Sequence, residues 1–370
     1  MKVRPQSARR VGSFQSALTQ SGSHRIRKCT RQLSPASRST ERAEVISPIV
    51  PTSALPAQAR ARTFVRCDLH QEDGMTDFEA ELHAIALQSS PNYRVLRKLE
   101  RRGLYEWPLP EHAKIGLIVD VETTGLDVSV DEVIELGMLR FAFGPSGTVF
   151  GPLSEFQTFR QPAKPIPKQV AQLTGITDEI VAGCNIDDST IREFVASADL
   201  IIAHNAEFDR RFCERLSSVF MDKAWACSQT QIPWRAQGVE GTKLFYLAYQ
   251  QSFWFEGHRA LDDCYALLEL LEMPLPVSHE ITMSKLLDAA NRPTMKIWAI
   301  GTPYEVKDRL RERGYKWNAG QDGRYRAWHR EIDPDQVEAE LRFLEDLDFP
   351  EIAPLVTTID ALLRFSDRLF

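Results

Sequence analysis

The chain has 370 residues, of which 43% are hydrophobic and 26% charged, and its formal net charge is −6. It is long enough to bury a core, and no apolar run approaches the roughly 20 residues of a membrane helix. Residues 1–75 hold 13 Lys/Arg against 5 Asp/Glu, a net +8, so the remainder carries −14. An acidic body is unlike the basic footprint of a passive nucleic-acid-binding protein, and it suits an enzyme that recruits cations.

The first 74 residues are rich in Ser, Arg, Pro and Ala and show no helical or strand period. This pattern predicts a disordered, processed or artefactual extension, with Met75 as an alternative start. The six cysteines of the chain form no CxxC pair, so neither a zinc site nor a disulfide scaffold is indicated. A reducing, cytoplasmic location is therefore expected, and no membrane partner.

Residues 75–112 are predicted to form a helical lead-in, because apolar positions recur at helical spacing between residues 77 and 102. The run Ile115–Glu122 is almost wholly apolar and ends in carboxylates, which is typical of a buried central strand with chemistry at its end. An apolar strand is also predicted at Leu200–Ala203. The other expected elements are strands at 132–142 and 148–160, and helices near 168–173, 189–197, 206–218, 243–250 and 259–272.

This order of elements predicts an α/β fold in which helices flank a mixed sheet over residues 113–273. A Pro-containing linker and helix are expected at 274–291, followed by a small α+β module at 292–370 that binds nucleic acid or a partner. The elements expected in the module are a strand at Lys296–Ile300, a helix at Tyr304–Arg313 ending at Gly314, a strand at Tyr325–Glu331 and a helix at Pro334–Leu347.

Asp120 and Glu122 alternate with valines at the end of the first predicted strand. Strand geometry puts both carboxylates on one face, where hard cations could share them. Alone, the pair could equally be two acids at an exposed turn. The small residues that follow, Thr123 to Leu126, would let a substrate backbone approach closely.

Two further polar groups stand at the starts of predicted helices. Asn205 follows the apolar strand in a position to cap the next helix, and Asp209 lies in that helix's first turn. His258 precedes another apolar helix that contains Asp262 and Asp263. Each of these residues has a plain structural reading as a cap, a surface acid or a core histidine.

Taken together, the sequences Asp120-x-Glu122-Thr-Thr-Gly, His204-Asn-x-x-Phe-Asp209 and His258-x4-Asp263 resemble the three motifs of the DEDDh exonuclease superfamily. That superfamily has a ribonuclease H-like fold and includes the epsilon subunit of bacterial DNA polymerase III, ribonuclease T and oligoribonuclease. The resemblance covers residues 115–272, with the motifs in the family order. The five-residue step from His258 selects Asp263 rather than Asp262 and favours the His variant over the Tyr variant.

The resemblance implies a magnesium- or manganese-dependent hydrolase with two divalent cations, Mg²⁺ or Mn²⁺. Its implied metal ligands are Asp120, Glu122, Asp209 and Asp263, with His258 as the general base. Substrate contacts are implied at Thr123, Thr124, Gly125, Leu126, Thr174 and Asn205. Thr174 and Gly175 have an equally good reading as a helix stop and turn.

The expected function is 3′-5′ exonuclease activity that releases 5′-mononucleotides from single-stranded or frayed DNA 3′ ends, in DNA repair, end trimming or proofreading in trans. The alternatives are an exoribonuclease of the ribonuclease T or oligoribonuclease kind and a non-catalytic nucleic-acid-binding module. A polymerase or repair protein is the expected protein partner. In the C-terminal module, Trp317 and Trp328 could stack on single-stranded bases or form the module's small core.

Overall fold

The computed structural model describes residues 77–320 and 324–368. The extension predicted for residues 1–74 lies outside the described residues, so its expected disorder stays a prediction. Within the two described ranges, no helix is both long and apolar enough to cross a membrane.

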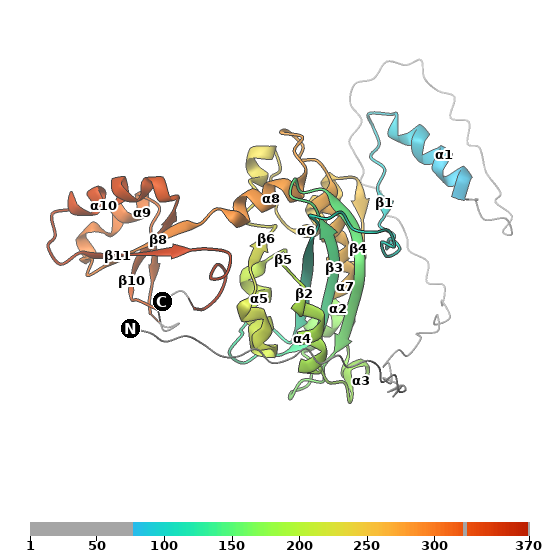
Figure 1. Ribbon diagram of the computed structural model, residues 1–370, viewed down its shortest axis with the longest axis horizontal. Helices are drawn as coiled ribbons and strands as arrows, with labels where there is room; N and C mark the ends of the chain where they lie inside the picture. Colours follow the sequence, from blue (N-terminus) through green and yellow to red (C-terminus); the bar gives the residue numbers. More distant parts are fainter. Residues whose placement is uncertain (1–76, 321–323, 369–370) are drawn as a thin grey trace, which may run out of the picture. The chain divides into compact units, whose positions relative to one another are not determined.

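A five-stranded mixed sheet forms the centre of the main domain, with the strand order β4-β3-β2-β5-β6 (Figure 1). β3 runs antiparallel to β2 and β4, whereas β5 is parallel to β2, and β6 is parallel to β5. The predicted mixed α/β sheet of the ribonuclease H-like type is therefore confirmed. The strands are β2 (Lys114–Thr123), β3 (Val133–Phe143), β4 (Val149–Phe159), β5 (Leu200–Ala203) and β6 (Trp225–Cys227).

Helices cover both faces of this sheet, as the sequence predicts (Figure 1). Leu117 and Val119 of β2 pack in a buried cluster with α4 and α5, whereas Ile118 packs in a second cluster with α6, α7 and α8. Because alternate strand residues point to opposite faces, Asp120 and Glu122 share the face of Ile118 and lie toward α7. The helices are α2 (Lys168–Thr174), α3 (Asp178–Val181), α4 (Asp188–Ala196), α5 (Ala206–Leu216), α6 (Leu244–Gln250), α7 (Ala260–Glu272) and α8 (Thr282–Asn291), with 3₁₀ helices η1 (Ser218–Asp222) and η2 (Trp234–Gln237).

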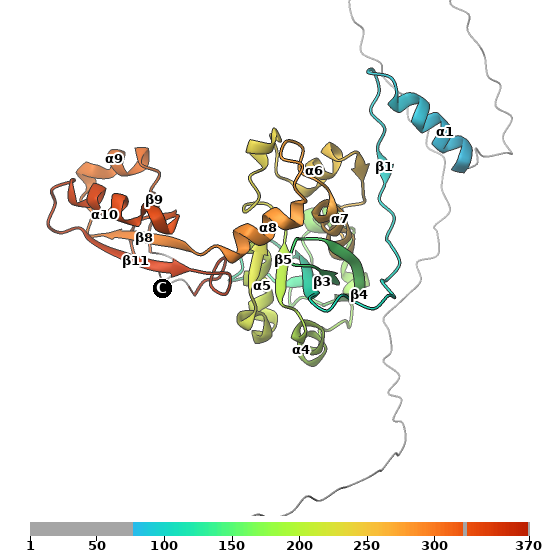
Figure 2. The same cartoon turned by 45° about the horizontal axis from the view of Figure 1, so that its top comes forward.

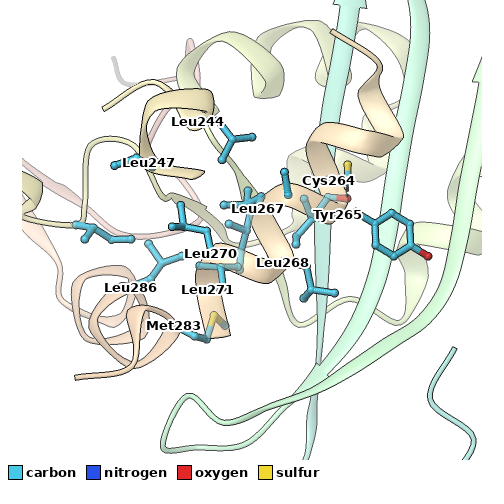
Figure 3. Packing of buried hydrophobic residues seen from close by; sticks show 14 of the residues in the cluster. Leu244, Leu247, Cys264, Tyr265, Leu267, Leu268, Leu270, Leu271, Met283 and Leu286 are labelled. Atoms are coloured by element: carbon cyan, nitrogen blue, oxygen red, sulfur yellow. Dashed lines mark hydrogen bonds between the residues drawn. The ribbon is translucent and has the colours of Figure 1, made fainter. Parts of the chain in front are cut away.

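Hydrophobic packing holds the second half of α7 in place (Figure 3). Leu267, Leu270 and Leu271 are buried in one cluster with Leu247 of α6 and Leu286 of α8. Burial of each such leucine stabilises the fold by about 1.5–3 kcal/mol. The end of α7 is therefore fixed by its core contacts, and its first turn combines the buried side chains of Ala260 and Leu261 with the polar residues Asp262 and Asp263.

Among the described residues of the lead-in, 77–112, α1 (Asp77–Gln88) is the only helix, which corrects the expected helix content up to residue 102. Beyond α1 the chain is extended (Figure 2). There β1 (Arg97–Lys98) pairs in parallel with β7 (Phe253–Trp254). Ion pairs fix this segment, and one of them joins Arg102 to Glu272 at 2.7 Å. Contacts with distant residues thus outweigh the local helix propensity that the sequence suggested.

The C-terminal module contains a four-stranded antiparallel sheet with the order β11-β8-β10-β9. Trp328 is buried in the module's core, while the ring of Trp317 lies 5.7 Å from it and is 47% exposed. The core reading therefore holds for Trp328 and only partly for Trp317. The elements are β8 (Thr294–Ile300), η3 (Tyr304–Val306), α9 (Lys307–Glu312), β9 (Lys316–Asn318), β10 (Ala327–Ile332), η4 (Pro334–Gln336), α10 (Val337–Glu345) and β11 (Ala353–Ile359).

The segment Asp360–Arg368 after β11 returns to the main domain and binds α5. The guanidinium of Arg210 on α5 is fully buried and pairs with Glu214 at 2.7 Å. It also donates hydrogen bonds to the backbone carbonyls of Leu362 and Arg364, each at 2.7 Å. These contacts make the C-terminal segment part of the stable structure of the main domain.

Replacing Arg210 by methionine is expected to lower the free energy of unfolding by on the order of 3 kcal/mol, because it leaves buried acceptors without a donor. Chemical denaturation measures this loss. Arg211→Met is the matched control, since Arg211 makes only a half-exposed ion pair with Asp367. We expect the control to change stability by less than about 1 kcal/mol. Equal losses in the two variants would contradict the anchoring role of Arg210.

Candidate active site

Three predicted metal ligands meet where the end of β2 faces the first turns of α7. Asp120, Glu122 and Asp263 each offer a carboxylate oxygen, and these oxygens lie within 4.8 Å of one another. Two of them come from alternate positions of one strand, and the third comes from a helix about 140 residues further along the chain. Such a group of oxygen ligands fits a hard divalent cation.

A glycine in β3 allows α7 to approach the sheet at this point. Gly137 is paired with Asp120 across the two strands. A Cβ atom added to Gly137 would lie 2.5 Å from the backbone carbon of Ala260 and 2.6 Å from the nitrogen of Leu261. Only glycine fits such a close contact between backbones. The contact brings the start of α7, and with it Asp263, to the end of β2.

Asp209 lies beside the cluster rather than within the group of three. It is in the first turn of α5, is 4% exposed, and its Oδ1 accepts a hydrogen bond from the backbone nitrogen of Val121 at 3.2 Å. Its negative charge is close enough to Asp120 to raise the pKa of that carboxyl. The structure thus brings three predicted ligands together and puts the fourth next to them.

Burial and mutual repulsion raise the pKa of all four carboxyl groups. Burial is the largest cause for each, and it raises the pKa of Glu122 to about 8 and those of Asp209 and Asp263 to about 7. The pKa of Asp120 is also well above its usual range, through burial and then through the charges of Asp263 and Asp209. A divalent cation would offset this repulsion, so the four acids fit a metal centre.

His258 lies on an exposed loop directly before α7 and has a positive φ of 65°. This left-handed conformation is uncommon for a residue with a side chain, and it persists where neighbouring contacts enforce it. Asp262 forms an ion pair with Arg101 at 2.8 Å, while Asp263 belongs to the acidic cluster. The two adjacent acids therefore have different surroundings, as the family spacing suggested.

The residues predicted to contact substrate after β2 form a tight turn. The hydroxyl of Thr123 donates to the carbonyl of Gly125 at 2.5 Å, and that of Thr124 donates to Asp131 at 2.9 Å. A Cβ on Gly125 would lie within 2.7 Å of the Asp131 carboxylate oxygens, so the turn needs glycine. Leu126, at the tip of the turn, is 85% exposed and is the member of this group best placed to meet a ligand.

The two other predicted substrate contacts differ in exposure. Thr174 is buried, its hydroxyl bonds to the carbonyl of Val170, and Gly175 ends α2 in the left-handed conformation. These two residues therefore act as the helix stop that was the alternative reading. Asn205 is exposed, and among the described residues its side chain makes no hydrogen bond that caps α5. Asn205 occupies the N-cap position of α5 as expected, with φ −158° and ψ 60°, but its side chain does not supply the capping hydrogen bond.

The sequence interpretation missed one polar residue beside the cluster. Glu135 of β3 is paired with Glu122 across the strands and is fully buried. Its carboxylate accepts hydrogen bonds from Gln157 at 2.5 Å and from Arg259 at 3.2 Å. The available signals were a charged residue inside an apolar strand and an arginine directly after His258.

A family of known proteins matches the part of the chain that holds the central sheet and the acidic cluster. Residues 117–271 match the RNase_T family model, described as Exonuclease. This stretch contains Asp120, Glu122, Asp209, His258 and Asp263. Over these residues, which make up less than half of the chain, the protein is similar to that exonuclease family.

Curated relatives of this domain belong to bacterial DNA polymerase III. The PolC-type DNA polymerase III of Thermotoga petrophila is 27% identical over 187 residues, which is 47% of this chain and 13% of the relative. The DNA polymerase III subunit epsilon of Treponema pallidum is 28% identical over 208 residues, 52% of this chain and 91% of that subunit. The chain thus matches only a small part of the PolC-type proteins.

Solved structures of exonucleases are also similar to the chain. Exonuclease X in complex with 5′ overhanging duplex DNA is 22% identical, with a TM-score of 0.33 over 47% of this chain and 90% of that one. Exonuclease I of E. coli with a dA16 oligonucleotide is 14% identical, with a TM-score of 0.39 over 64% of this chain and 71% of that one.

Proposed function

We propose that the chain is a metal-dependent 3′-5′ exonuclease that releases 5′-mononucleotides from DNA 3′ ends. The observation that carries this proposal is the group of carboxylates from Asp120, Glu122 and Asp263, whose oxygens lie within 4.8 Å in the part of the chain that is similar to the exonuclease family. The domain relatives within DNA polymerase III support DNA as the substrate. Repair, end trimming and proofreading in trans are roles that fit this activity, and a cytoplasmic location belongs to the same proposal.

Asp120, Glu122, Asp209 and Asp263 would hold two Mg²⁺ or Mn²⁺ ions. When bound, the ions would favour ionisation of an attacking water and offset the charge on the leaving 3′-oxygen. The carboxylates themselves must be ionised to bind cations, and their raised pKa values mean that binding releases protons. Leu126 and Asn205, both exposed, are proposed to contact the terminal nucleotide, with Thr123, Thr124 and Gly125 shaping the turn.

His258 is proposed to take the proton from the attacking water. Its side chain is exposed. The proposed metal ligand Asp263 lies five residues further along, in the helix that follows the loop of His258. An imidazole can accept a proton near neutral pH, and its placement before α7 leaves it free to face substrate. The attack on the phosphate then proceeds in line with the leaving oxygen.

His258→Ala is expected to lower kcat by about 10²–10⁴-fold, which is the usual contribution of a general base. Metal binding should be kept, because the four carboxylates are unchanged. Single-turnover hydrolysis and Mn²⁺ titration by calorimetry measure the two quantities. His279→Ala, on an exposed loop in which His279 also has a positive φ, is the matched control and should keep full activity. Unchanged turnover in His258→Ala would remove its role as base.

Matched DNA and RNA oligonucleotides of one sequence, single- and double-stranded, test the proposed substrate with Mg²⁺ or Mn²⁺. The catalytic carboxylates do not read the sugar, so discrimination depends on contacts near the 2′ position. We expect faster loss of single-stranded DNA than of RNA. Faster loss of RNA would make the chain an exoribonuclease with the same chemistry, and loss of neither would reject the proposed function. Co-purification with a polymerase or repair protein would test the proposed partner.

A further inference from the structure

The buried carboxylate of Glu135 lies next to the acidic cluster but makes its hydrogen bonds with the start of α7. It accepts from both Nε and Nη2 of Arg259, at 3.2–3.4 Å, and from the backbone nitrogen of Ala260 at 3.2 Å. Gln157 of β4 donates a further hydrogen bond at 2.5 Å. Glu135 is fully buried and is not one of the three residues whose oxygens meet within 4.8 Å.

The residues that Glu135 holds lie between the proposed base and a proposed metal ligand. Arg259 directly follows His258, whose φ of 65° needs support from its surroundings. The backbone nitrogen of Arg259 also donates to Oδ2 of Asp263 at 3.2 Å. The second half of α7 is fixed by leucine packing, as Figure 3 shows, whereas Glu135 supplies the charged anchor of the first turn. A displacement of Arg259 would therefore move both His258 and Asp263.

We infer that Glu135 is a positioning residue for the exonuclease reaction: it holds Arg259 and the N-terminus of α7 so that His258 faces the attacking water. This inference rests on the proposed function. The two carboxyl oxygens of Glu135 suit the task, because together they can accept from a guanidinium and a backbone N–H at once. Substituting a residue that orients a catalytic group commonly lowers activity as much as substituting some residues that contact the substrate directly.

The test uses the full chain with Glu135→Gln, which keeps the side chain's size. The amide keeps one accepting oxygen but carries no charge, and its NH₂ group is a donor that would face the donors of Arg259, Ala260 or Gln157, so the anchor on Arg259 is weakened. We expect kcat on a single-stranded DNA oligonucleotide to fall about 10–100-fold, with KM unchanged. In a His258→Ala background the same substitution should cost less than in the wild type, because the part of the loss that acts through His258 is then absent and only the part that acts through Asp263 remains.

Glu132→Gln is the matched control. The Glu132 carboxylate likewise accepts from an arginine, Arg160 at 3.1 Å, and from a backbone nitrogen, that of Ala163 at 2.7 Å, but neither partner belongs to α7 or to the loop before it. Its kcat should stay within about 2-fold of wild type. Arg259→Lys provides a second route, because it keeps the positive charge and loses the forked geometry, and it should reproduce the fall in kcat.

Thermal unfolding and circular dichroism report whether each variant is folded. If Glu135→Gln does not fold, the kcat of the Arg259→Lys variant alone tests the positioning role. An unchanged kcat in a folded variant, or an equal loss in the His258→Ala background, would overturn the positioning role while leaving the proposed function intact. A wild-type chain that shows no Mg²⁺-dependent degradation overturns the proposed function and this role with it.

Discussion

Asp120→Asn is expected to lower Mg²⁺-dependent hydrolysis by about 10³-fold or more, since even one lost contact to developing charge costs roughly 10²–10³-fold. Asp120 is the residue whose carboxyl feels burial and the charges of Asp263, Asp209 and Glu122 together. Its replacement removes a carboxyl group that, in the metal-free protein, must either bear a charge beside the other acids or stay protonated at a pH where the unfolded chain is ionised. The metal-free variant should therefore be more stable than the wild type while being inactive. Oligonucleotide hydrolysis and thermal unfolding in EDTA measure these opposite effects.

Asp262→Asn is the matched control for this prediction. It removes the same charge from a neighbouring position of α7, where the acid pairs with the partly exposed Arg101. The control should keep activity and change the free energy of unfolding by less than about 1 kcal/mol. Retained activity in Asp120→Asn, or a metal-free protein less stable than wild type, would contradict the assignment of Asp120 to a metal centre.

The metal-free protein is expected to lose stability as the pH rises from about 6.5 to about 8.5. Glu122, with a pKa of about 8, and Asp209 and Asp263, with pKa values of about 7, stay protonated in the folded state to higher pH than in the unfolded chain. The folded state thus binds more protons, so the free energy of unfolding falls as these groups ionise. Burial lowers the pKa of His204 to about 4, so His204 makes the free energy of unfolding rise with pH. That rise is complete near pH 6.5.

Divalent cations should reverse this trend, because they bind the ionised carboxylates. At 100 times its dissociation constant, Mg²⁺ adds about 2.7 kcal/mol to the free energy of unfolding. A larger fraction of the protein has ionised carboxylates, and can therefore bind Mg²⁺, at pH 8.5 than at pH 6.5. Urea denaturation at both pH values, with EDTA or with Mg²⁺, measures the four quantities. A stabilisation by Mg²⁺ that is equal at both pH values would contradict coupling between metal binding and these ionisations.

The elements that carry chemistry could be predicted from the sequence because their signals are local. β2 contains the apolar run from Ile115 to Val119, Leu200–Ala203 is apolar throughout, and α7 has apolar residues at helical spacing after a polar start. Five strands were missed, β1, β6, β7, β9 and β11, and they gain their hydrogen bonds from other segments of the chain. Pairing between distant segments leaves little trace in a short local sequence.

The candidate site likewise combines features that are visible in the sequence with features that arise only in the folded chain. The spacing of His258 and Asp263 is visible in the sequence, but the approach of α7 to Gly137 and the anchor at Glu135 depend on packing between elements. Glu135 resembles an ordinary strand residue when it is considered alone, because the register that puts it opposite Glu122 is set only in the folded sheet.

Polarity of degradation is the most direct test of the central proposal, and one oligonucleotide labelled in turn at each end decides it. With Mg²⁺, we expect 5′-labelled single-stranded DNA to shorten through a ladder of products, while 3′-labelled DNA releases its label at once as a mononucleotide. EDTA and Asp120→Asn should abolish both patterns. Immediate release of the 5′ label, cleavage at internal positions, or degradation that persists in EDTA would contradict a metal-dependent 3′-5′ exonuclease.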